Sequence, residues 1–332
     1  MFTCTFKKVH GSKNDFILID EKNMQRELSH EEKVKLALLL CDRKTGIGAD
    51  GILFVTVGGR TDGTMSIYNS DGTVASMCGN GLRVAGRYIL EQTGKEEVIV
   101  ETLKADLYVK KYVEQADLPF YQVEISPILF DPASLPMNTE KAMIINEKLP
   151  YLSENLTFTA LAVPNPHLIS IVPKEILLGG EQERIASFVN KENQYFPDGV
   201  NVSFIYPIQK GEIFVHTFER GVGFTNACGT AMSASSLVAI LNGLHDYETP
   251  LIVYNNGGFV KTIVHKQDDK QWIDLIGNGT YEFDGKVTVD LSRDLMKDFT
   301  KLQAYEDEVE QYRKIEEKAK QKRMEIFGRE SI

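Results

Sequence analysis

The apolar residues of this chain follow two patterns, short runs in which polar and apolar residues alternate and longer segments with the spacing of a helix. The first pattern is typical of strands and the second of helices. In the first half, strand-like runs surround helical segments at 29–41 and 79–94. In the second half, they surround helical segments near 181–190 and 230–243. The pattern predicts an α+β protein whose two halves are built alike.

The ends of two of these segments are marked by residues that favour helix boundaries. Ser29 and Glu32 form a capping box at the start of the first helix, and Gly94 is a stop signal for the second. Between the two halves, the segment 126–140 contains three prolines and is the best candidate for a linker.

The segment that starts near Asp294 differs from the rest because it is highly charged. Its apolar residues Leu302, Tyr305, Val309 and Tyr312 are three or four positions apart, which indicates a helix with one apolar stripe. We expect residues 293–332 to form a charged helical extension, docked on the body of the protein or on a second subunit.

Composition and charge exclude several classes of protein. The 332 residues suffice for two domains, and the formal net charge of −10 without a basic stripe argues against binding to nucleic acid. The sequence shows no signal peptide and no apolar run of membrane-spanning length. The chain has four cysteines, none of them in a C-x-x-C pair that would suggest zinc. We therefore expect a cytoplasmic protein with reduced thiols, no metal and no contact with a membrane.

One glycine-rich stretch, "GIGADG" at 46–51, matches the spacing of a dinucleotide-binding loop. That loop needs a strand before it and a helix after it. Here the order is reversed, with a predicted helix before and a predicted strand after. We interpret the stretch as a turn.

Two other stretches resemble each other: "SMCGNGLR" around Cys78 and "NACGTAMS" around Cys228. In each, a cysteine directly precedes small residues and a predicted helix. The N-terminus of a helix lowers the pKa of a nearby thiol, and its free N–H groups can bind a carboxylate. A single cysteine of this kind is most simply a packed core residue, but two alike favour function.

Two matched thiols predict a symmetric reaction. One thiolate removes a proton from one face of a carbon while the other thiol donates a proton to the opposite face. This is the two-base scheme of a racemase or epimerase, which needs no cofactor.

Polar residues near the two cysteines are candidate substrate ligands. Asn69 and Glu219 each lie nine residues before a cysteine, and the Arg220 guanidinium can pair with a carboxylate. His167 can adjust the protonation of a thiol. Taken singly, each of these residues is more often structural.

Six stretches together resemble the diaminopimelate epimerase family of cofactor-independent amino-acid epimerases. They occur in family order between residue 6 and about residue 290, and they are "HGSKNDFILID", "DRKTGIGADG", "YNSDGTVASMCGNGLR", "NPH", "FPDGVNV" and "FERGVGFTNACGTA".

The resemblance implies a fold of two pseudo-symmetric domains, each a mainly antiparallel β-barrel wrapped around a central helix, with the active site in the cleft between them. The expected domains are 1–128 with about 277–292, and 129–276. The implied reaction is epimerisation of LL-2,6-diaminopimelate to the meso form, a step of lysine and peptidoglycan precursor synthesis.

The resemblance also implies the roles of individual residues. The catalytic pair is Cys78 and Cys228, and His167 and Glu219 adjust their pKa values. The implied substrate-binding residues are Asn14, Asn69, Gly79, Asn80, Asn165, Asn201, Glu219, Arg220, Gly229 and Thr230. No cofactor is expected, and the expected partners are a small amino-acid substrate and, as one option, a second copy of the chain in a homodimer.

The chain departs from the family pattern at several positions. Lys13 replaces a glycine, Pro164 precedes the "NPH" motif, and Phe224 and Ala231 stand where the family has an acidic residue and a glycine. These departures keep open a related racemase of proline, hydroxyproline or histidine. A more remote alternative is a thiol redox or sensor protein, motivated by the two cysteines.

Overall fold

The computed structural model describes residues 1–112, 118–268 and 270–328. The chain divides into two compact units. Unit 1 comprises Met1–Val123 and Ile276–Lys314, and unit 2 comprises Glu124–Leu275 and Ile315–Ile332. The α+β fold predicted from the sequence is confirmed. The domain boundaries predicted above stay a prediction.

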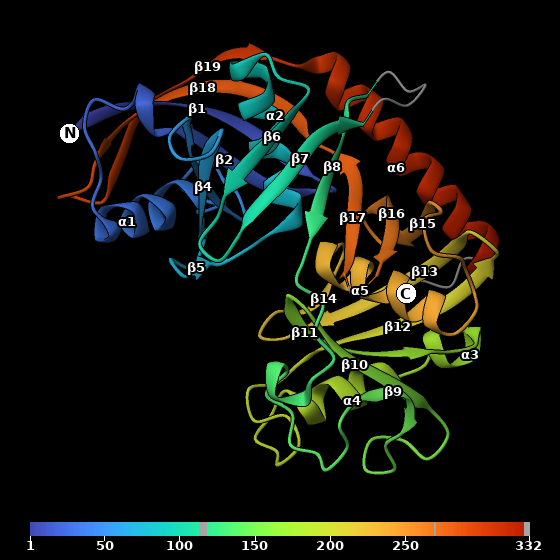
Figure 1. Cartoon of the computed structure of the whole chain (residues 1–332). Helices are drawn as coiled ribbons and strands as arrows, with labels where there is room; N and C mark the ends of the chain where they lie inside the picture. Colours follow the sequence, from blue (N-terminus) through green and yellow to red (C-terminus); the bar gives the residue numbers. More distant parts are fainter. Residues whose placement is uncertain (113–117, 269, 329–332) are drawn as a thin grey trace. The chain divides into compact units, whose positions relative to one another are not determined.

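Unit 1 consists mainly of strands, together with helices α1 and α2 (Figure 1). Its elements are β1 (Phe2–Gly11), β2 (Asn14–Asp20), α1 (His30–Cys41), β3 (Gly51–Val57), β4 (Gly63–Asn69), β5 (Val74–Ala75), α2 (Gly79–Thr93), β6 (Glu97–Glu101), β7 (Asp106–Tyr112), β8 (Phe120–Ile125), β18 (Thr280–Asp290) and β19 (Leu295–Ala304), with a short 3-10 turn at Glu21–Asn23. The last two residues of β8 belong to unit 2.

Unit 2 likewise consists mainly of strands with a few helices. Its elements are a 3-10 turn at Pro132–Ser134, β9 (Ile144–Lys148), β10 (Thr157–Val163), β11 (Asn165–Ile171), α3 (Lys174–Leu177), α4 (Glu181–Val189), β12 (Asn201–Gln209), β13 (Glu212–Glu219), β14 (Gly223–Thr225), α5 (Gly229–Leu241), β15 (Leu251–Asn255), β16 (Gly258–Gln267) and β17 (Lys270–Asn278), the last of which ends in unit 1.

The strand pairing of unit 1 is repeated in unit 2. The hairpin β1–β2 is followed by the parallel pair β2–β3, the hairpin β3–β4, the parallel pair β4–β6 and the hairpin β6–β7. In unit 2 the same order is β10–β11, β11–β12, β12–β13, β13–β15 and β15–β16. The two units therefore share one topology, with α2 equivalent to α5.

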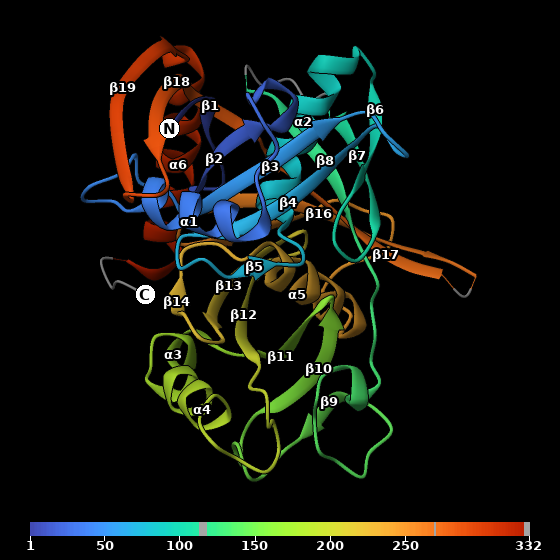
Figure 2. The same cartoon turned by 90° about the vertical axis from the view of Figure 1, so that its left-hand side faces the viewer.

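Each unit wraps its strands around one helix. Every residue from Gly79 to Leu90 of α2 is buried, as is every residue from Gly229 to Ile240 of α5. A helix that is buried on all sides must lie in a core. Helix α2 contacts β1, β2, β3, β4, β6 and β7. Helix α5 covers one face of the strands β10–β13, and α3 and α4 cover the other (Figures 1 and 2).

The two helix boundary signals act as predicted. The Ser29 side chain accepts a hydrogen bond from the Glu32 amide, and the Glu32 carboxylate accepts one from the Ser29 amide. Gly94 ends α2 in the left-handed conformation, with φ of 66°. Both confirm that local sequence sets the ends of these helices.

The prediction for the charged C-terminal segment is partly wrong. Helix α6 spans Glu306–Phe327, as expected, but Leu295–Ala304 form strand β19, which pairs antiparallel with β18. Pairing along β18 supplies backbone hydrogen bonds that a helix would otherwise supply. The last four residues of the segment, 329–332, lie outside the described residues.

Helix α6 has few apolar side chains, and two of its aromatic residues are used in packing. Tyr312 is buried in unit 1, and Phe327 belongs to the core of unit 2 together with Phe204 and Phe214. Among the helices that the structure describes, none has a stretch long and apolar enough to cross a bilayer.

Candidate active site

Both Cys78 and Cys228 occupy the N-cap position of a central helix. Their backbones are extended, with φ and ψ of −149° and 113° at Cys78 and of −127° and 108° at Cys228, and the helix begins at the next residue. The Gly81 amide donates a hydrogen bond to Cys78 Sγ over 3.5 Å. An N-cap side chain lies beside N–H groups that have no partner inside the helix. Each thiol therefore lies at the positive end of a helix dipole.

In unit 1, the thiol has a direct polar partner. Cys78 Sγ donates to Asn14 Oδ1 over 3.4 Å, and Asn80 Nδ2 donates to the same oxygen over 3.3 Å. Strand β2 begins at Asn14, and α2 contains Asn80 as its second residue. The structure thus brings together three residues that the sequence proposed separately. We call Asn14, Cys78, Gly79 and Asn80 the Cys78 half-site.

The orientation of the Asn14 amide is set by Asp50. Asn14 Nδ2 donates to Asp50 Oδ2 over 2.7 Å, and Arg43 Nη2 donates to Asp50 Oδ1, also over 2.7 Å. Because a carboxylate only accepts hydrogen bonds, the amide nitrogen must face Asp50 and the amide oxygen must face the thiol. Asp50 belongs to the "GIGADG" turn, so sequence reasoning assigned the turn correctly and missed its contact with the site.

Arg83 is a second residue that sequence reasoning missed. Its side chain is fully buried in α2, and Nη2 donates to Asn80 Oδ1 over 2.8 Å and to Ser12 Oγ over 3.0 Å. Burial lowers the pKa of Arg83 to about 10, against the opposing attraction of Cys78 and Tyr312. The guanidinium therefore keeps its positive charge at neutral pH, next to the thiol. A charged residue inside an otherwise apolar helix segment was the available signal.

Asn69 is placed differently from the other unit 1 candidates. Strand β4 ends at Asn69, whose Nδ2 donates to Thr73 Oγ1 over 2.9 Å. Its backbone amide also bonds the Thr73 carbonyl, so it shapes the turn between β4 and β5. These contacts join Asn69 to the turn, and its link to Cys78 stays a prediction.

In unit 2, Cys228 lies beside Thr230 and Glu219. Cys228 Sγ is 3.5 Å from Thr230 Oγ1, and the Glu219 carboxylate accepts a hydrogen bond from Thr225 over 2.6 Å. Burial raises the pKa of Cys228 well above its ordinary value, and the negative charge of Glu219 raises it further. The arrangement favours the protonated thiol. We call Glu219, Cys228, Gly229 and Thr230 the Cys228 half-site.

Asn201 and Arg220 lie together at the ends of β12 and β13. The Arg220 amide donates to Asn201 Oδ1 over 2.8 Å, and Arg220 Nη1 donates to the Asp198 carbonyl over 2.8 Å. Gly199 has φ of +70°, and a Cβ there would come within 3.0 Å of Arg220 Cδ. Glycine at 199 thus leaves room for the arginine, whose side chain stays exposed to solvent.

His167 is buried beneath this group of residues. It pairs with Asn201 in the parallel ladder of β11 and β12, and Asn165 lies two residues before it on the same strand. Neither ring nitrogen has a hydrogen-bond partner among the described residues. Burial lowers the pKa of His167 to about 3, and the charge of Arg220 acts in the same direction. At neutral pH this imidazole is uncharged.

Candidate residues of the two units occupy equivalent places in the shared topology. Asn14 and Asn165 begin β2 and β11, while Asn69 and Glu219 end β4 and β13. The equal spacing of Asn69 and Glu219 from the cysteines, noted in the sequence, therefore has a structural cause.

One of the departures from the family pattern near Cys228, Phe224, lies at a hollow of unit 2. The hollow has a volume of about 430 Å³, and Phe224, Thr225, Asn226 and Asn256 are among its lining residues. The Phe224 ring stacks on His216 with 4.5 Å between centroids. The aromatic ring at 224 is thus held by a neighbour of its own unit.

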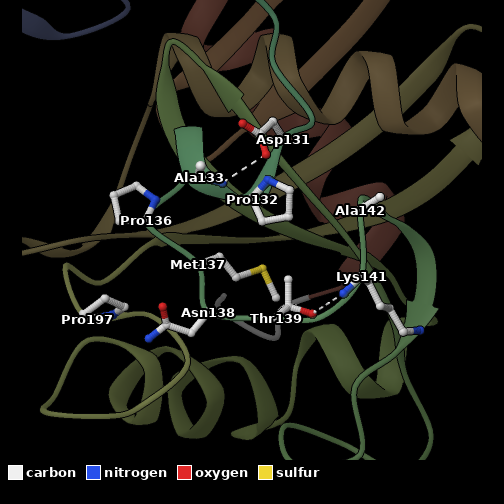
Figure 3. Close-up of a pocket in the computed structure, with 10 residues that line it drawn as sticks. All are labelled: Asp131, Pro132, Ala133, Pro136, Met137, Asn138, Thr139, Lys141, Ala142 and Pro197. Carbon is white, nitrogen blue, oxygen red and sulfur yellow. Dashed lines mark hydrogen bonds between the residues drawn. The ribbon is translucent and has the colours of Figure 1, made fainter.

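A second hollow of unit 2, of about 440 Å³, contains none of the predicted site residues (Figure 3). Its wall includes Asp131 and Lys141. Asp131 uses its carboxylate to cap the short turn that follows, by accepting a hydrogen bond from the Ala133 amide. We assign no chemistry to this hollow.

The contribution of Glu219 to the pKa of Cys228 can be measured directly. The Glu219→Gln substitution removes the negative charge that disfavours the thiolate, so the pKa of Cys228 falls. Alkylation of Cys228 by iodoacetamide, followed by peptide mass spectrometry between pH 6 and 10, should then begin at a lower pH. Glu175→Gln, at an exposed position of α3, is the matched control. Identical alkylation profiles in the wild-type and Glu219→Gln proteins would contradict the assignment.

Comparison with solved structures supports the fold. A phenazine biosynthesis protein of the PhzF family from Bacillus anthracis aligns with 87% of this chain and 100% of its own, with a TM-score of 0.61 and 18% identity. A hydroxyproline epimerase from Agrobacterium vitis aligns with 87% and 94%, with a TM-score of 0.57 and 13% identity. At these identities the likeness concerns the fold alone.

Comparison with sequences gives the family. A Listeria monocytogenes diaminopimelate epimerase (serotype 4a) is 46% identical over 330 residues, covering 96% of this chain and 100% of its own. A Ligilactobacillus salivarius diaminopimelate epimerase is 51% identical over 283 residues, covering 82% and 86%. The profile of the family described as diaminopimelate epimerase matches residues 6–124 and 159–282, which include both half-sites. The chain belongs to the diaminopimelate epimerase family.

Proposed function

We propose that this protein is an isomerase that converts LL-2,6-diaminopimelate to the meso form by proton transfer between Cys78, Cys228 and one α-carbon. The observation that carries the proposal is that each unit places a cysteine at the N-cap of its central helix, in a chain 46–51% identical to diaminopimelate epimerases. A stereocentre has two faces, and a two-base reaction needs one acid or base for each.

The reaction proceeds in two proton transfers. The thiolate of one cysteine takes the α-proton and becomes a thiol, while the C–H electron pair remains on the substrate as a carbanion. The thiol of the other cysteine gives its proton to the opposite face and becomes a thiolate. The two cysteines end with exchanged protonation states. Because its pKa is raised by burial and by Glu219, Cys228 starts as the proton donor.

The substrate is held by groups around the two helix starts. The α-carboxylate binds the free N–H groups at the starts of α2 and α5, where Gly79 and Gly229 allow close approach. These groups also stabilise the negative charge that develops as the proton leaves. Arg220 pairs with a carboxylate of the substrate and Glu219 with an ammonium group. Asn14, Asn69, Asn80, Asn165, Asn201 and Thr230 supply the remaining polar contacts.

Proton exchange in deuterated water tests this function. Purified protein, without added cofactor, is incubated with LL-2,6-diaminopimelate, and the products are separated by chiral chromatography and mass spectrometry. We expect meso product that carries one deuterium at the inverted carbon. A parallel panel of L-proline, trans-4-hydroxy-L-proline and L-histidine covers the related racemases. Faster exchange of any of these amino acids would overturn the assigned substrate, and disulfide exchange without any α-proton exchange would support the redox alternative.

We also propose that the protein works in the cytosol and forms a homodimer. The first point is supported by the four cysteines, none of which forms a disulfide. The second rests on the sequence analysis alone, because the buried side chains Tyr312 and Phe327 of α6 pack against their own chain. Sedimentation equilibrium of the purified chain measures the mass of the assembly.

A further inference from the structure

The turn between β1 and β2 has an unfavourable backbone conformation. Ser12 and Lys13, neither of them glycine, have φ of 53° and 66°. The left-handed region is costly for residues with a Cβ, and two such residues in succession are rare. Surrounding contacts must therefore hold this turn in place. The turn leads directly into Asn14, whose amide oxygen accepts the hydrogen bond from the Cys78 thiol.

The first half of the turn is held by buried hydrogen bonds. The Ser12 amide donates to Asn278 Oδ1 over 2.9 Å, and Ser12 Oγ accepts from Arg83 over 3.0 Å. In the second half of the turn, the Lys13 amide donates a longer hydrogen bond to His10 Nδ1, over 3.4 Å.

Helix α6 contacts the turn at this second half. The Tyr312 ring meets the His10 ring edge to face, with 4.5 Å between centroids, and the Lys13 ammonium lies 5.2 Å from the centre of the same ring. Tyr312 is 3% exposed, although α6 is otherwise highly charged. An aromatic face attracts a cation, so the ring holds the Lys13 side chain as well as covering the turn.

Helix α6 is fixed one turn before Tyr312. Arg87 of α2 binds the Glu308 carboxylate with two hydrogen bonds, of 2.6 and 2.7 Å, and the same carboxylate accepts from the Tyr281 amide over 3.1 Å. Paired, largely buried bonds of this kind set orientation as well as distance. Arg87 lies within α2, and Cys78 is the N-cap residue of the same helix. The contact with Glu308 therefore fixes the position of α6 relative to the helix that carries the thiol.

We propose that Tyr312 is a positioning residue for the Cys78 half-site. By holding Lys13 and His10, it keeps the Ser12–Lys13 turn in the conformation that presents the Asn14 amide oxygen to the thiol. The role of Asn14 beside a reacting Cys78 rests on the proposed function, whereas the contact between α6 and the turn does not. The C-terminal helix therefore acts on catalysis without touching the substrate.

Substitutions at 312 test this role in the full chain. Tyr312→Leu removes the flat ring but keeps an apolar helix-forming residue, Tyr312→Phe keeps the ring, and Val309→Ala is the control on an exposed part of the same helix. We expect Tyr312→Leu to lower kcat about tenfold with KM changed less than about twofold, because a small displacement of a catalytic group is costly. Tyr312→Phe should keep most of the wild-type kcat, and Val309→Ala should have the same kcat and KM as the wild type.

A second measurement does not depend on turnover. Iodoacetamide alkylation, read for each cysteine by peptide mass spectrometry, should become faster at Cys78 in Tyr312→Leu, since the thiol loses its Asn14 partner, and should not change at Cys228. Lys13→Gly relieves the backbone strain, so the Tyr312→Leu loss in kcat should shrink in a Lys13→Gly background. An unchanged Cys78 alkylation rate, or equal changes at both cysteines, overturns the proposal. A wild-type protein without epimerase activity overturns the proposed function instead.

Discussion

We expect replacement of either Cys78 or Cys228 with alanine to lower the rate of epimerisation by about a thousandfold or more, the range expected when a general acid or base is removed. In the proposed two-base reaction each cysteine serves one face of the carbon, so neither can substitute for the other. The measurement is meso-diaminopimelate formation from the LL isomer, with deuterium incorporation at the α-carbon followed in parallel.

The other two cysteines provide matched controls. Cys4 and Cys41 are buried, and burial raises the pKa of each thiol to about 12, so neither supplies a thiolate at neutral pH. Cys4→Ala and Cys41→Ala proteins should keep the wild-type rate constant once they are shown to be folded. Turnover retained in Cys78→Ala or in Cys228→Ala would rule out the two-base scheme.

Much of the fold follows from local sequence. Alternating runs give the strands, and the capping box at Ser29 and the glycine at 94 set helix ends that the structure reproduces. The buried helices α2 and α5 are recognisable from their small residues and from their position directly after a cysteine. Local rules succeed here because the tertiary structure agrees with them.

The prediction failed where tertiary pairing overrides the local pattern. Leu302 and Tyr305 continue the three-and-four spacing of α6, but residues 295–304 pair with β18 as strand β19. Strand β18 ends at Asp290 and β19 begins at Leu295, so the two strands form a hairpin that the spacing of apolar residues in the tail does not reveal. A sequence pattern cannot show that a strand edge is free to pair. The predicted helix therefore included residues 295–304, which form a strand.

The sequence predicts the candidate reactive groups but not all of the residues that hold their neighbours in place. A repeated motif indicates the two cysteines, and the family resemblance implies Asn14 and Asn80. Asp50 and Arg83 did not, because an aspartate in a glycine turn and an arginine in a helix have ordinary structural roles in most proteins. Only the three-dimensional contacts show that Asp50 orients Asn14 and that Arg83 bonds Asn80.

Arg83 contributes hydrogen bonds to the core of unit 1, and its positive charge acts on Cys78. Its guanidinium is packed so closely that a Cβ at Gly277 would come within 3.0 Å of it. It donates to Asn278, Ser12 and Asn80, and Nη1 has no hydrogen-bond partner among the residues that the structure describes. A buried cation of this kind costs desolvation free energy, which the attraction of a nearby thiolate offsets in part.

Arg83→Met should therefore affect stability and catalysis together. Leaving three buried acceptors unpaired should lower the free energy of unfolding by about 3 kcal/mol, measured by urea denaturation. Loss of the positive charge and of the Asn80 contact should also lower kcat about a hundredfold.

Ile89→Ala in the same helix is the matched control, because a buried cavity costs about 2–5 kcal/mol without changing any charge near the thiol. Arg83→Lys keeps the charge without the planar fork, so it should fall between the wild type and Arg83→Met in kcat. If Arg83→Met and Ile89→Ala were equally active after correction for the folded fraction, Arg83 would be a structural residue only, and the thiol would depend on the helix N-terminus and Asn14 for its activation.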